Sequence, residues 1–129
     1  ADIRLRFDNP ETIADYYMED LRHKDREYLV LIMLDSKCRL ISEKTMTVGT
    51  VNASLISARE IYIEAVKKQA VNIVLLHNHP SGDSTPSTQD IYSTKKVIEA
   101  GRIIGISLID HIIIGDNNYV SLKERGIID

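Results

Sequence analysis

The sequence has few of the residues that stabilise secreted or membrane proteins. Among its 129 residues there is one cysteine, Cys38, so no internal disulfide can form, and a reducing, cytoplasmic location is expected. No apolar run approaches the ~20 residues of a membrane-spanning helix, and residues 1–10 contain no apolar signal core. We therefore expect neither membrane insertion nor secretion. Because the chain begins with Ala1 rather than Met, we expect it to be part of a longer protein.

Basic residues are not in excess either. Lys and Arg total 16 against 19 Asp and Glu, which gives a net charge of −3. Non-specific DNA binding requires a positively charged surface that displaces counterions, so this composition makes nucleic acid only a weak candidate partner. The six tyrosines are scattered and do not form the pattern of a base-stacking platform.

The chain has the length and composition of one globular domain, spanning residues 1–129. Hydrophobic residues make up 43% and charged residues 27%, an ordinary balance for a folded protein. A chain of this size can bury enough surface to form a core without disulfides or a structural metal. No repeat, low-complexity tract or linker divides it.

Capping signals predict three helices. Asn9 is a good N-cap for the first, and Ser57 with Glu60 forms a capping box for the second. Ser87 is expected to cap the third helix, and Gly101 to end it. The helices are expected over residues 10–24, 57–70 and 87–100.

Apolar runs between these helices predict strands. Residues 27–34 are apolar almost throughout, which is typical of a strand buried on both faces. The runs over 103–109 and 110–115 indicate a strand pair or one bent strand, followed by a hairpin turn at 115–118 and a short strand at 119–121. The remaining strands are expected over 38–48 and 71–77. This order predicts an α/β (α+β) fold with a mixed sheet flanked by helices.

The candidate functional residues lie where the strand over 71–77 ends. His77 and His79 are two residues apart, so their side chains point to one side of a strand, and paired imidazoles are natural zinc ligands. Asp90 lies in the first turn of the next helix. Two histidines and one carboxylate leave a fourth tetrahedral position for water, which is typical of a catalytic zinc site.

Each of these residues also has an interpretation without a metal. His77 could be a core histidine whose hydrogen bonds are satisfied, and Ser87 with Asp90 could be a simple capping box. Asp83 is another carboxylate in the same loop and could compete as a ligand. Spacing alone leaves the metal-binding and structural interpretations open.

Two further positions invite comment. Asp110 and His111 could pair near this site, or His111 could be packed within the sheet, which we favour. Cys38 has no histidine beside it in the sequence, so we interpret it as structural rather than as a nucleophile.

The spacing of these residues resembles the JAMM (MPN+) metalloprotease motif, which is H-x-H, seven residues, S, two residues and D. The fuller string HNHPSGDSTPS-x-x-D closely resembles the bacterial RadC family, and the likeness runs from about residue 20 to 126. It implies a JAMM/MPN-like (cytidine-deaminase-like) architecture, with a partly barrel-like sheet and zinc at the sheet edge. Flanking residues that contribute are Gly49-Thr50, Arg59-Glu60 and Asp110-His111.

The resemblance also implies roles for individual residues. His77, His79 and Asp90 resemble the three zinc ligands. Ser87 resembles the residue that stabilises a tetrahedral oxyanion.

JAMM enzymes also use an upstream glutamate that takes a proton from the zinc-bound water. Glu27 is the best match, at the start of the first strand, where a carboxylate entering a buried strand is unfavourable unless it is paired or functional. Glu27 could instead be an ordinary residue at an exposed strand end. Glu43 and Glu60 are its rivals for the role.

The implied activity is that of a zinc-dependent hydrolase acting on a peptide or isopeptide bond, with a peptide or protein as substrate. The alternative is a RadC protein associated with DNA repair or replication, whose domain acts as a binding module. Longer RadC proteins carry an N-terminal helix-hairpin-helix-like region, so we expect this chain to be the C-terminal part of such a protein.

Overall fold

The computed structural model describes residues 5–49 and 57–129, so Thr50 of the sequence pattern lies outside the described residues. The helices are α1 (Pro10–Leu21), α2 (Ala58–Lys67) and α3 (Thr88–Ile104). The strands are β1 (Tyr28–Leu34), β2 (Leu40–Val48), β3 (Asn72–Asn78), β4 (Ser107–Ile114) and β5 (Tyr119–Ser121). No helix in the described part of the chain combines the length and apolar character needed to cross a membrane.

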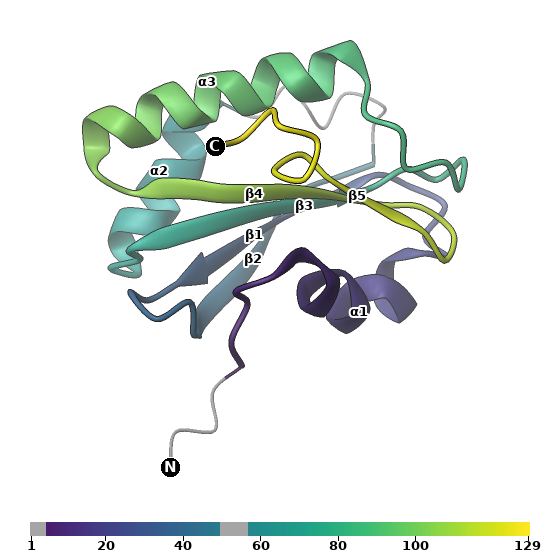
Figure 1. Ribbon diagram of the computed structural model, residues 1–129, viewed down its shortest axis with the longest axis horizontal. Coiled ribbons are helices and arrows are strands. Elements are labelled where there is room, and N and C mark those ends of the chain that lie inside the picture. Colours follow the sequence, from purple (N-terminus) through teal and green to yellow (C-terminus); the bar gives the residue numbers. More distant parts are fainter. Residues whose placement is uncertain (1–4, 50–56) are drawn as a thin grey trace.

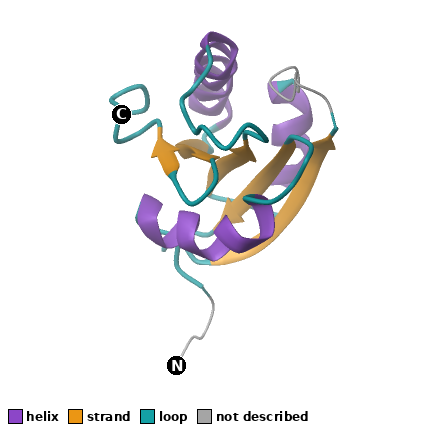
Figure 2. Ribbon diagram, turned by 90° about the vertical axis from the view of Figure 1, so that its right-hand side faces the viewer, coloured by secondary structure: helices purple, strands orange, loops and turns teal. Residues whose placement is uncertain are grey.

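The described strands form one mixed sheet in the order β2-β1-β3-β4-β5. Only the β3–β4 pair is parallel, and the other neighbours are antiparallel. Helices α2 and α3 cover one face, which we call the α3 face, and α1 covers the other, the α1 face (Figures 1 and 2). The predicted mixed sheet flanked by helices is confirmed, while its partly barrel-like character stays a prediction.

The predicted N-caps of the first two helices, Asn9 and Ser57, are confirmed. The side chain of Asn9 accepts the backbone N–H of Thr12 at 2.9 Å, and Ser57 Oγ accepts that of Glu60 at 3.3 Å. These bonds satisfy N–H groups that have no partner within the helix. The first helix ends at Leu21, three residues earlier than predicted.

The predicted end of α3 was wrong. The helix continues through Gly101 to Ile104, and Gly105, in the left-handed region with φ 88°, is its C-cap. A Cβ at Gly101 would lie 2.4 Å from both the Tyr62 hydroxyl and the Ile106 carbonyl oxygen, so glycine permits close packing there rather than ending the helix. The start of the run predicted as strand over 103–109 is therefore helical. Of the two alternatives, a strand pair or one bent strand, the structure has a single strand, β4.

The sheet separates two apolar clusters, one on each face. Strands β1 and β3 contribute to both, which explains their nearly continuous apolar sequences. Leu75 belongs to the cluster on the α3 face and Leu76 to the cluster on the α1 face. Because side chains alternate along a strand, His77 projects to the α3 face and Asn78 to the α1 face.

A β-bulge decides which side chains of β4 reach each face. Ile73 lies opposite Leu108, whereas the next residue of β3 lies opposite Asp110, so Ile109 is the extra residue. The shift brings His111 opposite Leu75 on the α3 face. Without the extra residue His111 would turn to the α1 face, because a one-residue slip reverses every side chain beyond it.

Candidate metal centre

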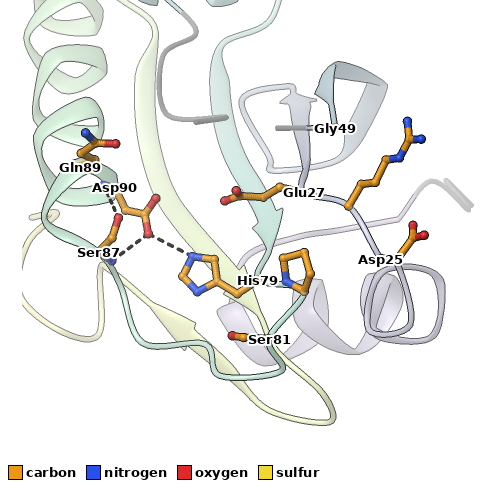
Figure 3. Close-up of a pocket in the computed structure, with 10 residues that line it drawn as sticks. Asp25, Glu27, Gly49, His79, Ser81, Ser87, Gln89 and Asp90 are labelled. Carbon is orange, nitrogen blue, oxygen red and sulfur yellow. Dashed lines mark hydrogen bonds and ion pairs between the residues drawn. The ribbon is translucent and has the colours of Figure 1, made fainter. Parts of the chain in front are cut away.

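Four side chains from separate elements converge at one end of the sheet. Glu27 directly precedes β1, His77 lies in β3, His79 directly follows β3, and Asp90 lies in the first turn of α3. One donor atom of each lies within 4.8 Å of the others, and all except His79 are buried. Figure 3 shows Glu27, His79 and Asp90 around a common space.

Strand register and one loop bring these residues together. Leu29 pairs with His77 in the antiparallel β1–β3 ladder, which places Glu27 across from His79. The loop after β3 is held by His79, whose N–H donates to the Ile114 carbonyl and whose carbonyl accepts the N–H of Gly82. The chain then returns to begin α3 beside the histidines, and this return brings Asp90 to them.

The donor atoms are close enough together to share one metal ion, with a different Asp90 oxygen beside each histidine. His77 Nε2 lies 3.1 Å from His79 Nε2 and 3.3 Å from Asp90 Oδ1, and His79 Nε2 lies 3.2 Å from Asp90 Oδ2. Ligands bound to zinc at ~2.0–2.1 Å are separated by about 3.3–3.4 Å along each tetrahedral edge. Two imidazole nitrogens and a carboxylate oxygen are also the donor types that zinc prefers. Glu27 Oε1 is slightly farther, 3.6 Å from His77 Nε2.

Hydrogen bonding fixes the proton of His79 on the nitrogen that faces away from the cluster. His79 Nδ1 lies 2.9 Å from the backbone carbonyl oxygen of Asp83, which can only accept, so Nδ1 carries the hydrogen. In the neutral ring, Nε2 then keeps a lone pair directed at the cluster. The Asp83 carboxylate instead accepts the N–H and hydroxyl of Thr85, so Asp83 does not join the four converging side chains as a rival ligand.

The capping box predicted at the start of α3 is confirmed, and it uses the same carboxylate. Ser87 Oγ accepts the N–H of Asp90 at 3.0 Å, and Asp90 Oδ2 accepts the N–H of Ser87 at 2.9 Å. A carboxylate offers about four lone-pair positions, so capping leaves others for the cluster. The structural and metal-binding interpretations are therefore compatible, because the cap holds Asp90 in the orientation that faces both histidines.

The two buried carboxyl groups of the cluster have opposite pKa shifts. Burial favours the neutral form of Asp90, but the adjacent imidazoles of His77 and His79 outweigh it and hold the Asp90 pKa well below its usual range. Burial raises the pKa of Glu27, although the same two histidines oppose the shift. The hydrogen bond to Asp90 raises the pKa of His79. Asp90 is thus suited to be an ionised ligand, and Glu27 is the better proton acceptor.

The geometry separates Glu27 from its rivals. Glu43, on edge strand β2, lies beside the Tyr17 hydroxyl of α1, and burial and this carboxylate raise the Tyr17 pKa. Glu43 therefore belongs to the opposite face of the sheet. Glu60 is exposed in the first turn of α2, where its N–H is capped by Ser57. Neither is among the four converging side chains.

A pocket of about 450 Å³ opens beside the cluster. This volume falls within the ~300–1,000 Å³ range of typical ligand sites. Glu27, His79 and Asp90 form part of its wall (Figure 3). The other lining residues are Asp25, Arg26, Gly49, Pro80, Ser81, Ser87 and Gln89.

The sequence analysis assigned no role to Asn78, which lies between the two histidines. Its Oδ1 accepts the N–H of Tyr28 at 2.7 Å, and its Nδ2 donates to the carbonyl of Arg26 at 2.9 Å. These two backbone groups flank Glu27, so Asn78 fixes the backbone that carries the glutamate. The available signal was an amide side chain at the end of an apolar run, which is unfavourable when buried unless it is hydrogen-bonded.

His111 is buried in the sheet, as we favoured, and it also contacts the site. Its Nε2 lies 2.7 Å from His77 Nδ1, and its Nδ1 lies 2.6 Å from Thr94 Oγ1. Burial holds the His111 pKa well below its usual value, so the ring is neutral. Asp110 instead bonds Ser121 and the N–H of Lys123. Cys38 is a free, half-buried thiol packed against the cluster on the α1 face.

Comparisons with known proteins identify the family of this chain. The chain is 46% identical over 128 residues to a UPF0758 protein of Desulforamulus reducens, covering 99% of this chain and 56% of that protein. It is 51% identical over 120 residues to a UPF0758 protein of a Geobacillus species, strain WCH70, covering 93% and 53%. The chain thus spans about half the length of the curated relatives it matches. Residues 7–127 match the family model described as the RadC-like JAB domain, and the chain belongs to this family.

Proposed function

We propose that this domain is a zinc-dependent hydrolase of the JAMM type that cleaves a peptide or isopeptide bond. The observation that carries the proposal is that His77 Nε2, His79 Nε2 and the Asp90 carboxylate lie 3.1–3.3 Å from one another beside an open pocket, close to the separation of ligands on one zinc ion. These three residues would hold the ion. When bound there, zinc supplies Lewis acidity, which lowers the pKa of water and polarises a carbonyl group.

Glu27 would act as the general base. Glu27 lines the pocket beside the two histidines, and the raised pKa of its carboxyl group favours accepting a proton. The same group would then pass that proton to the leaving amine. Asn78 would hold the backbone on both sides of Glu27 and so keep the carboxylate in place.

Ser87 would stabilise the oxyanion. Its Oγ accepts the N–H of Asp90, and this leaves the hydroxyl hydrogen to donate to a substrate oxygen in the pocket. A donor placed in advance where negative charge develops stabilises a transition state more than the ground state.

The test is a comparison of two Glu→Gln variants. Wild type should bind one zinc ion per chain and cleave members of a mixed peptide library, measured by mass spectrometry. Glu27→Gln should retain zinc and lose at least ~100-fold in cleavage rate, the usual contribution of a general base. Glu43→Gln makes the same change on the opposite face and should cleave like wild type. Equal activity of Glu27→Gln and wild type would remove Glu27 from the mechanism.

A second measurement tests the ion itself. His77→Ala and Asp90→Ala should each lose stoichiometric zinc, while wild type retains it. A wild-type chain that takes up no zinc with its ligands free would refute the hydrolase proposal. The DNA-associated alternative stays a prediction, which salt-sensitive retention on DNA would support.

A further inference from the structure

A buried chain of hydrogen bonds leads from one proposed ligand back to another. His77 Nδ1 contacts His111 Nε2 at 2.7 Å, and His111 Nδ1 contacts Thr94 Oγ1 at 2.6 Å. The Thr94 hydroxyl in turn donates to the backbone carbonyl of Asp90 at 2.7 Å. His77, His111 and Thr94 are exposed by 2%, 4% and 0%, so water does not compete for these bonds.

The hydrogens of this chain can be assigned from its far end. The carbonyl of Asp90 can only accept, so it takes the Thr94 hydroxyl hydrogen. Thr94 Oγ1 must then accept from His111 Nδ1, which places a ring hydrogen on Nδ1. The hydrogen-bond partners of this buried ring are the Thr94 hydroxyl and the His77 ring, and neither is an anion that would stabilise a second ring hydrogen. His111 Nε2 is left as an acceptor.

The assignment ends at the proposed metal centre. Because His111 Nε2 accepts, His77 Nδ1 must donate to it. The neutral His77 ring then carries a lone pair on Nε2, the atom that lies 3.1 Å from His79 Nε2. These hydrogen bonds therefore hold His77 in the tautomer that can bind a metal ion. The assignment starts from the backbone carbonyl of Asp90 and does not require the ion to be present.

We propose that Thr94 and His111 are positioning residues that set the His77 tautomer and thereby the zinc affinity of the domain. The inference rests on the proposed metal centre and adds two residues that do not line its pocket. Removing such outer partners of metal-binding histidines typically lowers metal affinity about 10–100-fold.

A matched pair of variants tests the role of Thr94. Thr94→Val keeps the branched shape but removes the hydroxyl, and Thr94→Ser keeps the hydroxyl but removes the methyl group. Zinc affinity, measured by competition with a chelator, should fall about 10–100-fold in Thr94→Val and stay within about threefold of wild type in Thr94→Ser. A packing role alone would give the opposite order or equal losses.

Nitrogen NMR of the imidazole rings gives a readout that does not depend on activity. In zinc-free wild type, His111 and His77 should both be the Nδ1–H tautomer, and Thr94→Val should increase the Nε2–H form of His77 while Thr94→Ser should not. The wild-type spectrum tests the assignment even if Thr94→Val fails to fold.

The outcomes separate this inference from the proposed function. Suppose that wild type takes up zinc normally. Then a His111 ring in the Nε2–H form would overturn this inference and leave the proposed function intact, and so would equal zinc affinities in Thr94→Val and Thr94→Ser. Wild type that binds no zinc would refute the proposed function and the inference with it.

Discussion

Two buried aspartates, Asp90 and Asp110, lie in the same domain and have different surroundings. Asp110 is 3% exposed, and its oxygens accept the Ser121 hydroxyl at 2.6 Å and the N–H groups of His111 and Lys123 at 2.7 and 3.1 Å. Asp90 is 5% exposed, and its oxygens face two imidazoles beside a pocket.

The difference shows what makes a buried carboxylate a candidate ligand. The donors around Asp110 are neutral groups that keep their hydrogens, and burial raises the Asp110 pKa. The Ser121 and Lys123 donors tie β4 to β5 and to the segment after it, so Asp110 is structural. The groups facing Asp90 are the Nε2 atoms of His77 and His79, which carry lone pairs in the neutral rings, so both imidazoles and the carboxylate can bind one cation.

The largest expected effect separates the two aspartates directly. Asp90→Asn should weaken zinc binding more than ~100-fold, because one of three ligands loses its charge. Asp110→Asn should leave zinc affinity within a few-fold and lower the free energy of unfolding by about 1–3 kcal/mol, because a buried acceptor becomes a misplaced donor. Chelator competition and urea denaturation measure the two quantities. Equal loss of zinc affinity in both variants would contradict the assignment of Asp90 as a ligand and Asp110 as a structural residue.

Two serine N-caps, Ser87 and Ser57, give a second comparison between a residue at the site and a structural one. Ser87→Ala and Ser57→Ala each remove an N-cap and should each lower the free energy of unfolding by about 1 kcal/mol. Only Ser87→Ala should also lower the cleavage rate, by about 100-fold, because only that hydroxyl lies at the pocket. The peptide assay and thermal unfolding check both, and matching activity losses would argue for a purely structural Ser87.

Two asparagines of β3 extend the comparison to the positioning of Glu27. Asn78→Ala should lower the cleavage rate about tenfold or more, because the backbone around the glutamate loses both of its side-chain hydrogen bonds. Asn72→Ala, at the opposite end of the same strand, should cleave at the wild-type rate. Steady-state kinetics on a cleaved peptide measure the difference. Retained activity in Asn78→Ala would show that Glu27 does not need this support.

The smallest effect is a pH dependence confined to the metal centre. The hydrogen bond to Asp90 raises the His79 pKa, so a proton competes with zinc at a higher pH than for an unperturbed histidine. Zinc affinity should therefore decrease as the pH falls from 7 to 6, by up to about tenfold for the proton that His79 must lose. Asp110→Asn should show the same profile. Calorimetric titrations that give a flat profile would contradict the role of the histidines as ligands.

Local features of the sequence predicted the parts of the site that depend on local structure. Strand alternation predicts that His77 and His79, two residues apart, point to one side. Helix capping predicts the reciprocal hydrogen bonds between Ser87 and Asp90. The position of Glu27 was expected from the resemblance and from its place before a buried strand. These predictions needed no knowledge of how distant elements pack.

The remaining features depend on contacts between distant elements. Gly101 has the sequence signature of a helix end, but the approach of Tyr62 and Ile106 requires a glycine inside the helix. His111 reaches His77 only because the extra residue Ile109 shifts β4. A bulge leaves no clear mark in the sequence of β4, so the side of the sheet taken by His111 could not be read from the sequence.

X-ray absorption spectroscopy of the zinc-loaded wild-type chain tests the central claim most directly. The account predicts one zinc ion per chain with nitrogen and oxygen ligands at about 2.0–2.1 Å and scattering from two imidazole rings. A chain that remains without zinc, a sulfur ligand at about 2.3 Å, or a shell without imidazole would contradict it.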